Sequence, residues 1–376
     1  MPASAPPRGS TALPRLGRRA GLFGGLAAAA FPPRGRPAAA APPSAATFLA
    51  PGPLGSPQAR WAAHFATALG RATAPQPTEL RPAVLGGADG VTAANRFATA
   101  AAPDGRTLLA LAGAAAHARL IGDSRARYEP SAWLPVCGLV EPTALLVRAA
   151  AAAPPVALRR AGGSAAPGPL RLALPGPEAP EAAALLALDL LGIRAEPVFG
   201  LSGPAAVQAF AAGRVNAFLA RDPALAALGA MLGAELWFAA APAEAGGGPS
   251  RARRDPALPE VPSLAERIAL QAAGGAASPA AEAILAADAG LAAVRLGFTI
   301  VLPALTPADM VALWRHAAAR LGAELEDDDA GAPASRGLLL GTEAAAAYAA
   351  LCAVPEPVVQ TYRGWLARRL NWRSGG

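Results

Sequence analysis

The chain has 376 residues, 53% of them hydrophobic and 16% charged, which is enough for two domains with substantial cores. Its net charge of +7 comes mainly from six arginines in the first forty residues, a stretch without acidic residues, so the rest carries only +1. A nearly neutral body lacks the electrostatic attraction on which nucleic-acid binding relies, and we expect no nucleic-acid partner.

The first forty residues have the order of an export leader. Basic residues end at Arg18–Arg19, an apolar run extends from Ala20 to Phe31, and small residues gather at Ala38–Ala41. The run is too short to span a bilayer, which takes about 20 residues. We therefore predict a signal peptide over residues 1–40 and a periplasmic mature protein. The Sec and twin-arginine routes both stay open, and a disordered Pro/Ala-rich tail is the alternative.

After the leader, segments typical of strands alternate with segments typical of helices. Thr47–Ala50 has the pattern of a short buried strand, and the next helix carries Trp61, Phe65 and Leu69 on one face. An extended piece, a helix and a buried strand follow, at residues 79–85, 91–101 and 107–111. This alternation predicts α/β units around a mostly parallel sheet.

The same alternation of predicted strands and helices begins again after a Pro/Gly-rich segment at residues 151–169. Strands are predicted at 170–174, 195–199 and near 219, with helices at 181–191 and 204–212. Residues 240–279 are rich in Ala, Gly, Pro and Arg, which predicts irregular structure. A strand at 298–302 and helices at 307–321 and 342–372 complete the chain, with an acidic loop at 324–328 between the helices.

No motif for metal binding or nucleophilic catalysis is present, and we expect no metal and no cofactor. Cys137 and Cys352 fit no metal spacing; an oxidising compartment allows them to pair, but two separate buried thiols is the simpler interpretation. His64, His117 and His316 are isolated, and no Gly-x-Ser-x-Gly nucleophile elbow occurs.

Five stretches together resemble the Bug solute receptors, the substrate-binding components of tripartite tricarboxylate transporters. Ala102–Leu109 is similar to their Ala-Pro-Asp-Gly-Tyr-Thr-Leu-Leu segment, and Arg254–Glu266 to their Arg-Ser-Pro-Ala-Leu-Pro-Asp-Val-Pro-Thr-Val-Ala-Glu segment. Weaker matches fall between them, at residues 128–136, 199–205 and 213–216. The matches occur in the family's order over residues 47–370.

The resemblance implies an α/β, two-lobed type II periplasmic-binding-protein fold, each lobe a mostly parallel sheet flanked by helices. It assigns residues 41–145 to the first lobe, 146–290 to the second, and 291–376 to a return to the first lobe with the C-terminal helices. It also implies a non-enzymatic protein, a monomer that captures a small carboxylate in the cleft between the lobes and delivers it to a membrane permease.

Five residues are candidates for ligand binding: Gly55, Ser56, Gly86, Gly87 and Ser202. Glycines that open helices present backbone N–H groups and the positive end of the helix dipole to an anion. The structural alternatives are a plain turn at Gly86–Gly87 and helix N-caps at Ser56 and Ser202. In the family, the loop that corresponds to Ser202 faces the cleft, and the resemblance favours the binding role over a plain turn at Gly86–Gly87.

The loops depart from the family in ways that bear on the ligand. The family's first loop ends in an Asp that is missing from residues 51–58, so an amine-bearing ligand is disfavoured, and an aromatic or branched monocarboxylate is expected. About twenty residues, 267–287, are inserted relative to the family. Three alternatives remain open: a ligand-sensing partner of a membrane receptor, a family member that has lost its transport role, and an enzyme using Asp89 and Glu178 across the cleft.

Overall fold

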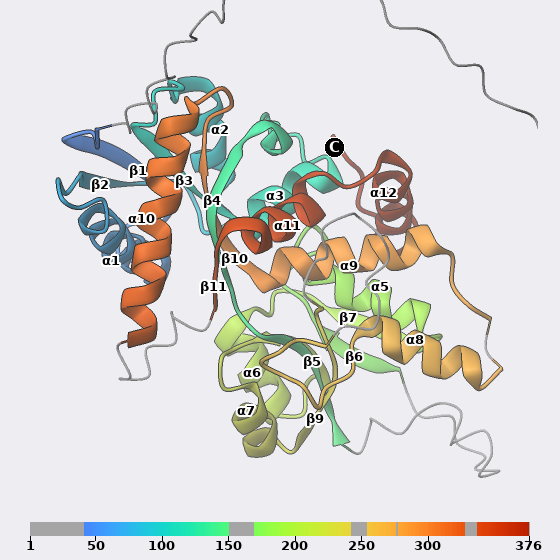
Figure 1. Ribbon diagram of the computed structural model, residues 1–376. Coiled ribbons are helices and arrows are strands. Elements are labelled where there is room, and N and C mark those ends of the chain that lie inside the picture. Colours follow the sequence, from blue (N-terminus) through green and yellow to red (C-terminus); the bar gives the residue numbers. More distant parts are fainter. Residues whose placement is uncertain (1–40, 150–168, 242–253, 276, 328–336, 376) are drawn as a thin grey trace, which may run out of the picture. The chain divides into compact units, whose positions relative to one another are not determined.

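The computed structural model describes residues 41–149, 169–241, 254–275, 277–327 and 337–375, so the predicted leader at 1–40 lies outside the described part of the chain. Two separate sheets organise these residues (Figure 1). We call each sheet with its covering helices a lobe.

The first sheet has six strands in the order β11-β4-β10-β3-β1-β2. Their bounds are β1 Ala45–Pro51, β2 Glu79–Leu85, β3 Thr107–Ala112, β4 Leu134–Val140, β10 Leu296–Leu302 and β11 Leu338–Leu339. The second sheet has five strands in the order β7-β6-β8-β5-β9. These strands are β5 Thr143–Arg148, β6 Leu170–Ala173, β7 Ala195–Val198, β8 Ala217–Arg221 and β9 Ala234–Ala239.

Both sheets are mixed rather than mostly parallel, which corrects the sequence-based expectation. The parallel core is β2-β1-β3 in the first sheet and β7-β6-β8 in the second. The added strands pair antiparallel: β10 with β3 and β4, and β5 with β8 and β9. The reason is topological, because β5 and β10 are the strands on which the chain enters a sheet after leaving the other lobe.

Alternation along the buried strands fixes the two faces of the first sheet. On β3, Leu108 and Ala110 belong to the core under α1 (Pro57–Arg71) and α10 (Ala308–Asp327). Leu109 and Leu111 point the other way, into the core under α2 (Val91–Ala100), α3 (Gly113–Ile121) and α11 (Gly341–Cys352). Successive side chains of a strand point to opposite faces, so a continuous apolar run marks a strand covered on both sides.

The second sheet is covered by α5 (Ala182–Leu190), α6 (Gly203–Ala211), α7 (Leu225–Leu232) and α8 (Leu264–Ala273). Helix α8 lies in a region predicted to be irregular. Its start is defined by a capping box, in which Ser263 Oγ accepts from the Glu266 amide and Glu266 accepts from the Ser263 amide. The acidic residues 324–327, predicted as a loop, instead continue α10.

The chain passes between the lobes at two places before its last helices. Strand β4 of the first sheet is followed by β5 of the second, with only Glu141–Pro142 between them. Helix α9 (Ala281–Arg295) packs on α5 in the second lobe and on α3 in the first, and leads directly into β10. Residues 281–287 of the suspected insertion form the beginning of this connecting helix.

The C-terminal region differs from expectation in two respects. The predicted helix 342–372 is divided into α11 and α12 (Glu356–Leu370), because Pro355 and Pro357 cannot continue a helix. Helix α12 was expected on the first lobe but contacts both lobes: Arg363 donates to the Leu120 carbonyl on α3 at 3.0 Å, while Trp365 Nε1 donates to Asp189 on α5 at 2.9 Å. Its apolar face joins the core of the second lobe, while α10 and α11 contact β4 of the first.

The two cysteines are separate free thiols. Cys137 is fully buried on β4, and burial raises its pKa to about 12. Cys352 ends α11. Two separate thiols were the simpler interpretation of the sequence.

Candidate functional site

A cavity of about 890 Å³ opens between the elements of the two sheets. From the first lobe it is lined by residues that include Gln58, Asp89, Gly113, Arg125 and Phe298. From the second lobe it is lined by residues that include Pro175, Glu178, Gly203, Phe218 and Asp222. Ala293 and Val294, on the connecting helix α9, complete the lining. The cavity therefore lies where the chain crosses between the lobes.

The topology explains why polar groups converge on this cavity. Helices α2, α3 and α6 follow directly on strands β2, β3 and β7, so their N-termini lie at the carboxyl ends of parallel strands. In open α/β sheets, ligands bind outside these carboxyl ends. Residues from all three junctions line the cavity: Asp89 before α2, Gly113 at the start of α3, and Gly203 at the start of α6.

Gly113 also sets how closely α3 approaches the connecting helix. A Cβ at this position would lie 2.0 Å from the carbonyl oxygen of Ala293 and 2.4 Å from that of Leu296. Only glycine allows the two backbones to pass at this distance. The residue thus holds the first-lobe wall of the cavity against the α9–β10 junction.

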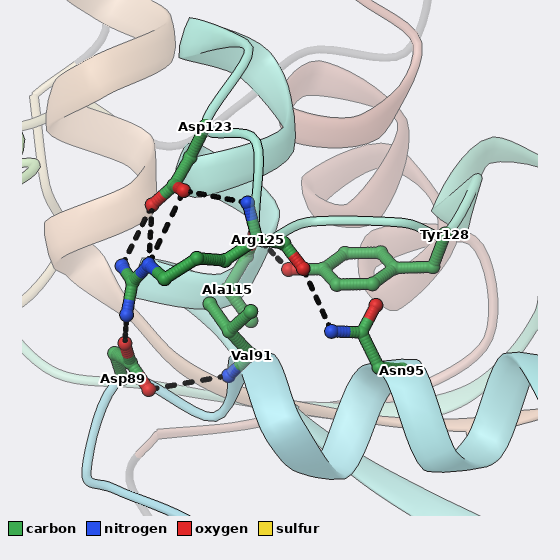
Figure 2. A network of polar contacts seen from close by, with 7 residues as sticks. All are labelled: Asp89, Val91, Asn95, Ala115, Asp123, Arg125 and Tyr128. Atoms are coloured by element: carbon green, nitrogen blue, oxygen red, sulfur yellow. Dashed lines mark hydrogen bonds and ion pairs between the residues drawn. The ribbon is translucent and has the colours of Figure 1, made fainter. Parts of the chain in front are cut away.

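Three residues of the cavity lining, Asp89, Asp123 and Arg125, form an ion-pair network, which Figure 2 shows from close by. Arg125 Nη1 lies 2.9 Å from Asp89 Oδ2, and Arg125 Nη2 lies 2.6 Å from Asp123 Oδ2. Burial by itself would raise the pKa of Asp123, but hydrogen bonds from the side chain and amide of Arg125 lower it overall. The guanidinium group is therefore paired with two of the protein's own carboxylates.

The loop that carries Arg125 is fastened to the neighbouring helices. Asn95 on α2 donates to the Arg125 carbonyl at 2.7 Å and accepts from the Arg127 amide at 2.9 Å. The Tyr128 hydroxyl donates to the Ala115 carbonyl on α3 at 2.7 Å (Figure 2). Because the backbone on both sides of Arg125 is held, its side chain is presented to Asp89 in a fixed direction.

The second lobe contributes three further carboxylates to the lining. Glu178 and Glu181 belong to the turn before α5, and Asp222 follows β8. Burial raises the pKa of Glu181, because its charged form loses hydration there. Arg221, which also lines the cavity, lies 2.6 Å from Glu141 Oε2 and donates to the Val294 carbonyl.

The structure places the predicted residues Gly55 and Ser56 at the start of α1. Ser56 is the N-cap: its Oγ accepts from the Ala59 amide at 3.1 Å. Gly55 has φ +80°, and its carbonyl accepts from Arg60. Neither residue is part of the cavity lining, whereas Gln58 in the first turn of the same helix is.

Gly86 and Gly87 lie beside the loop that leads to Ser56. Gly86 has φ +70°, and a Cβ there would lie 2.4 Å from that of Thr92. The Gly87 carbonyl accepts from the Gly52 amide at 3.2 Å, so the structure brings the β1–α1 and β2–α2 loops together. The cavity is lined by the next two residues along the chain, Ala88 and Asp89.

Ser202 is the exposed N-cap residue of α6, and its hydroxyl makes no capping hydrogen bond. The next two residues, Gly203 and Pro204, line the cavity. The five predicted residues thus occupy loops whose neighbours line the cavity, and their binding role stays a prediction.

Sequence reasoning missed Asp123, Arg125, Glu181 and Asp222. Asp222 had an available signal, because an acidic residue directly after a strand lies at the carboxyl edge of the sheet. Asp123 and Arg125 follow α3 in a polar loop without glycine-rich character, and only the fold brings them to Asp89.

His117 is a buried contact near this site rather than a ligand. It is fully buried on α3, and its Nε2 lies 3.0 Å from the hydroxyl oxygen of Tyr362 on α12. Burial lowers the pKa of His117 to about 3, although the backbone of Glu178 acts in the opposite sense. The ring is therefore neutral and joins the first lobe to α12.

Within the described ranges, no cluster of His, Cys, Asp and Glu is arranged to hold a metal ion. No helix in those ranges is both long and apolar enough to cross a membrane.

Neither a protein-family model nor a curated protein matches the sequence. Solved structures do match. A TctC solute-binding protein from Polaromonas, determined without ligand, has a TM-score of 0.59 at 17% identity, over 86% of this chain and 98% of that one. The R. palustris protein Rpa4515 with adipate has a TM-score of 0.53 at 19% identity, over 85% and 98%. A periplasmic transporter has a TM-score of 0.50 at 16% identity, over 89% and 100%.

The chain has the two-lobed fold of these structures. This confirms the type II fold that the resemblance to the Bug receptors implied. The Polaromonas neighbour is a solute-binding protein. In keeping with this, Asp89 does not form a free carboxylate pair with Glu178, since its two oxygens bind Arg125 and the Val91 amide.

Proposed function

We propose that this protein is a periplasmic solute-binding protein that captures a small carboxylate in the cavity between its lobes and delivers it to the membrane permease of a tripartite tricarboxylate-type transporter. The observation that carries the proposal is the position of the cavity, at the carboxyl ends of strands from two sheets joined by crossing segments. Lobes connected in this way close on a ligand by hinge motion.

The fold and one bound neighbour support a carboxylate. Rpa4515, which has the same fold, was determined with adipate. In this chain the helices α2, α3 and α6 begin around the cavity, and helix N-termini favour negative charge. The loops at Gly55–Ser56 and Gly86–Gly87 hold the ligand's carboxylate from the first lobe, and Ser202 closes on it from the second.

A thermal-shift panel tests the proposal on protein lacking residues 1–40. Carboxylates of different size and branching are compared with amines and sugars. A ligand at 100 times its Kd adds about 2.7 kcal/mol to the free energy of unfolding. At roughly 2–4 °C per kcal/mol, a true ligand raises Tm by about 5 °C or more. A clear shift with a sugar, and none with any carboxylate, would reject the carboxylate assignment.

Export and partnership are tested separately. N-terminal sequencing of protein from the periplasmic fraction is expected to show cleavage near residue 40, whereas an intact Met1 on cytoplasmic protein would overturn export. Copurification with a permease supports transport. Copurification with a membrane receptor instead would favour the alternative, a ligand-sensing partner of the same fold. Light scattering is expected to show a monomer.

A further inference from the structure

The cavity lining carries an excess of negative charge. Five carboxylates line it against two guanidinium groups: Asp89, Asp123, Glu178, Glu181 and Asp222 against Arg125 and Arg221. Both guanidinium groups are already paired, Arg125 with two of these carboxylates and Arg221 with Glu141. Among the described lining residues, an incoming carboxylate therefore meets no unpaired arginine.

The anion position at the start of α2 is filled by the protein itself. Asp89 Oδ1 accepts from the Val91 amide at 3.3 Å, while Asp89 Oδ2 lies 2.9 Å from Arg125 Nη1 (Figure 2). Backbone N–H groups and the dipole at a helix N-terminus stabilise one negative charge, and here that charge is an internal side chain. Asp89 offsets the attraction of this helix start, so the Gly86–Gly87 loop can hold one carboxylate through its backbone N–H groups but adds no electrostatic attraction for a polyanion.

The second lobe presents three carboxylates that lie outside its close ion pairs. Within the described residues, Glu178, Glu181 and Asp222 take part in no ion pair at 4.0 Å or less. Asp222 accepts only a backbone amide, from Ala224 at 2.6 Å. Glu178 lies over Gly176, where a Cβ would approach its Oε1 to 2.6 Å. Burial raises the pKa of Glu181, while the charge of Arg221 acts in the opposite sense.

We infer that the ligand carries a cationic, ammonium-type group in addition to its carboxylate, and that this group lies against Glu178, Glu181 and Asp222. The inference rests on the proposed function and narrows its ligand class to zwitterions, such as amino acids and ω-amino acids. It also reverses the sequence-based expectation that an amine-bearing ligand is disfavoured. That expectation rested on the Asp missing from residues 51–58, whereas these acidic residues come from the turn between β6 and α5 and from the end of β8. A cationic group that leaves water beside these carboxylates is attracted to them, whereas the second carboxylate of a dicarboxylate is repelled.

Matched pairs of ligands test the charge preference by isothermal titration calorimetry at pH 7 and fixed ionic strength. Adipate is compared with 6-aminohexanoate, and succinate with 4-aminobutanoate, since each pair has nearly equal length and differs in one terminal charge. The amino acid is expected to bind at least tenfold more tightly than its dicarboxylate partner. Equal or tighter binding of the dicarboxylates overturns the inference and leaves the proposed function standing. If neither series binds, the inference is overturned, and the carboxylate panel described above decides the proposed function.

Charge-removing variants locate the cation. The double variant Glu178→Gln with Asp222→Asn removes two negative charges while keeping hydrogen-bond acceptors. It is expected to weaken binding of the ω-amino acids at least tenfold and to leave the dicarboxylates unchanged or tighter. The matched control is Glu196→Gln with Glu235→Gln, on exposed strand positions of the same lobe outside the lining. Equal effects of the two double variants would overturn the placement of the cation, and melting curves check that both are folded.

Discussion

The Nε2 atom of His117 lies 3.0 Å from the hydroxyl oxygen of Tyr362, and both side chains are buried. The two residues come from α3 and α12, elements separated by most of the chain. Because the His117 ring is neutral in the folded protein, the contact is a hydrogen bond between uncharged groups in an environment that excludes water. Protonation of the ring would place an uncompensated charge there.

This burial predicts acid sensitivity. The folded-state pKa of His117, about 3, is below the value of about 6.5 in an unfolded chain, so the unfolded state binds the extra proton. The contribution of His117 is thus complete above pH 6.5 and is lost as the pH falls toward 3, at about 1.4 kcal/mol per pH unit. Urea denaturation at pH 6.5 and 4.5 is expected to show a loss of about 2–3 kcal/mol from this residue. His117→Gln should remove that part of the difference, while His64→Gln, at an exposed position of α1, should retain it.

The two N-cap serines are expected to respond differently to removal of their hydroxyls. Ser56→Ala deletes the hydrogen bond to the Ala59 amide and should lower the free energy of unfolding by about 1 kcal/mol. Ser202→Ala deletes no capping hydrogen bond and should leave stability within about 0.5 kcal/mol, while it weakens ligand binding. Chemical denaturation and calorimetry on both variants check this; a large stability loss in Ser202→Ala would contradict it.

The free energy of unfolding should depend far more on the buried ion pair between Asp255 and Arg295 than on the more exposed pair between Arg254 and Glu266. Arg295 Nε lies 2.9 Å from Asp255 Oδ2, with side chains only 11% and 3% exposed. Asp255→Asn leaves a buried guanidinium group unpaired and should cost about 3 kcal/mol. Arg254→Gln breaks the more exposed pair with Glu266 and should cost at most about 1 kcal/mol. Urea midpoints of the two variants give the comparison, and equal losses would show that burial does not govern these pairs.

Two glycine-to-alanine substitutions are expected to change the free energy of unfolding in opposite directions. Gly113→Ala places a methyl group 2.0 Å from the Ala293 carbonyl oxygen, so backbone must move, and we expect a loss of about 3 kcal/mol or more. Gly364→Ala on α12 meets only the end of the Arg368 side chain, at 3.1 Å. It should gain about 0.5–1 kcal/mol from reduced chain entropy. Thermal melts distinguish the two, and a neutral Gly113→Ala would show that the α3–α9 approach is loose.

The sequence predicted those elements whose signal is local. The apolar run at 107–111 identified β3 because that strand is covered on both faces, and Trp61, Phe65 and Leu69 identified the buried side of α1. Helix α8 was missed because its Ala/Gly-rich surroundings outweighed the Ser263–Glu266 capping box. The contact of α12 with the second lobe depends on partners distant in sequence, such as Asp189, and no local pattern contains that information.

The candidate site was predictable in its loops and not in its charges. Glycine-rich turns pointed to the junctions before α1, α2 and α6, and residues next to the predicted ones line the cavity. The pairing of Arg125 with Asp89 and Asp123 arises only after the loop following α3 is folded back onto α2. The charge of the cavity is therefore a product of tertiary structure.

The strand order of the first sheet has a consequence for biosynthesis. Strand β10 lies between β3 and β4, yet the whole second lobe is encoded before it. During synthesis, β3 and β4 leave the ribosome before the strand that lies between them, and the sheet cannot be completed until residue 302 has followed. Until then each presents an unpaired edge, the kind of surface on which aggregation begins. Folding of the first lobe is thus a late event, dominated by contacts distant in sequence, and slow for that reason.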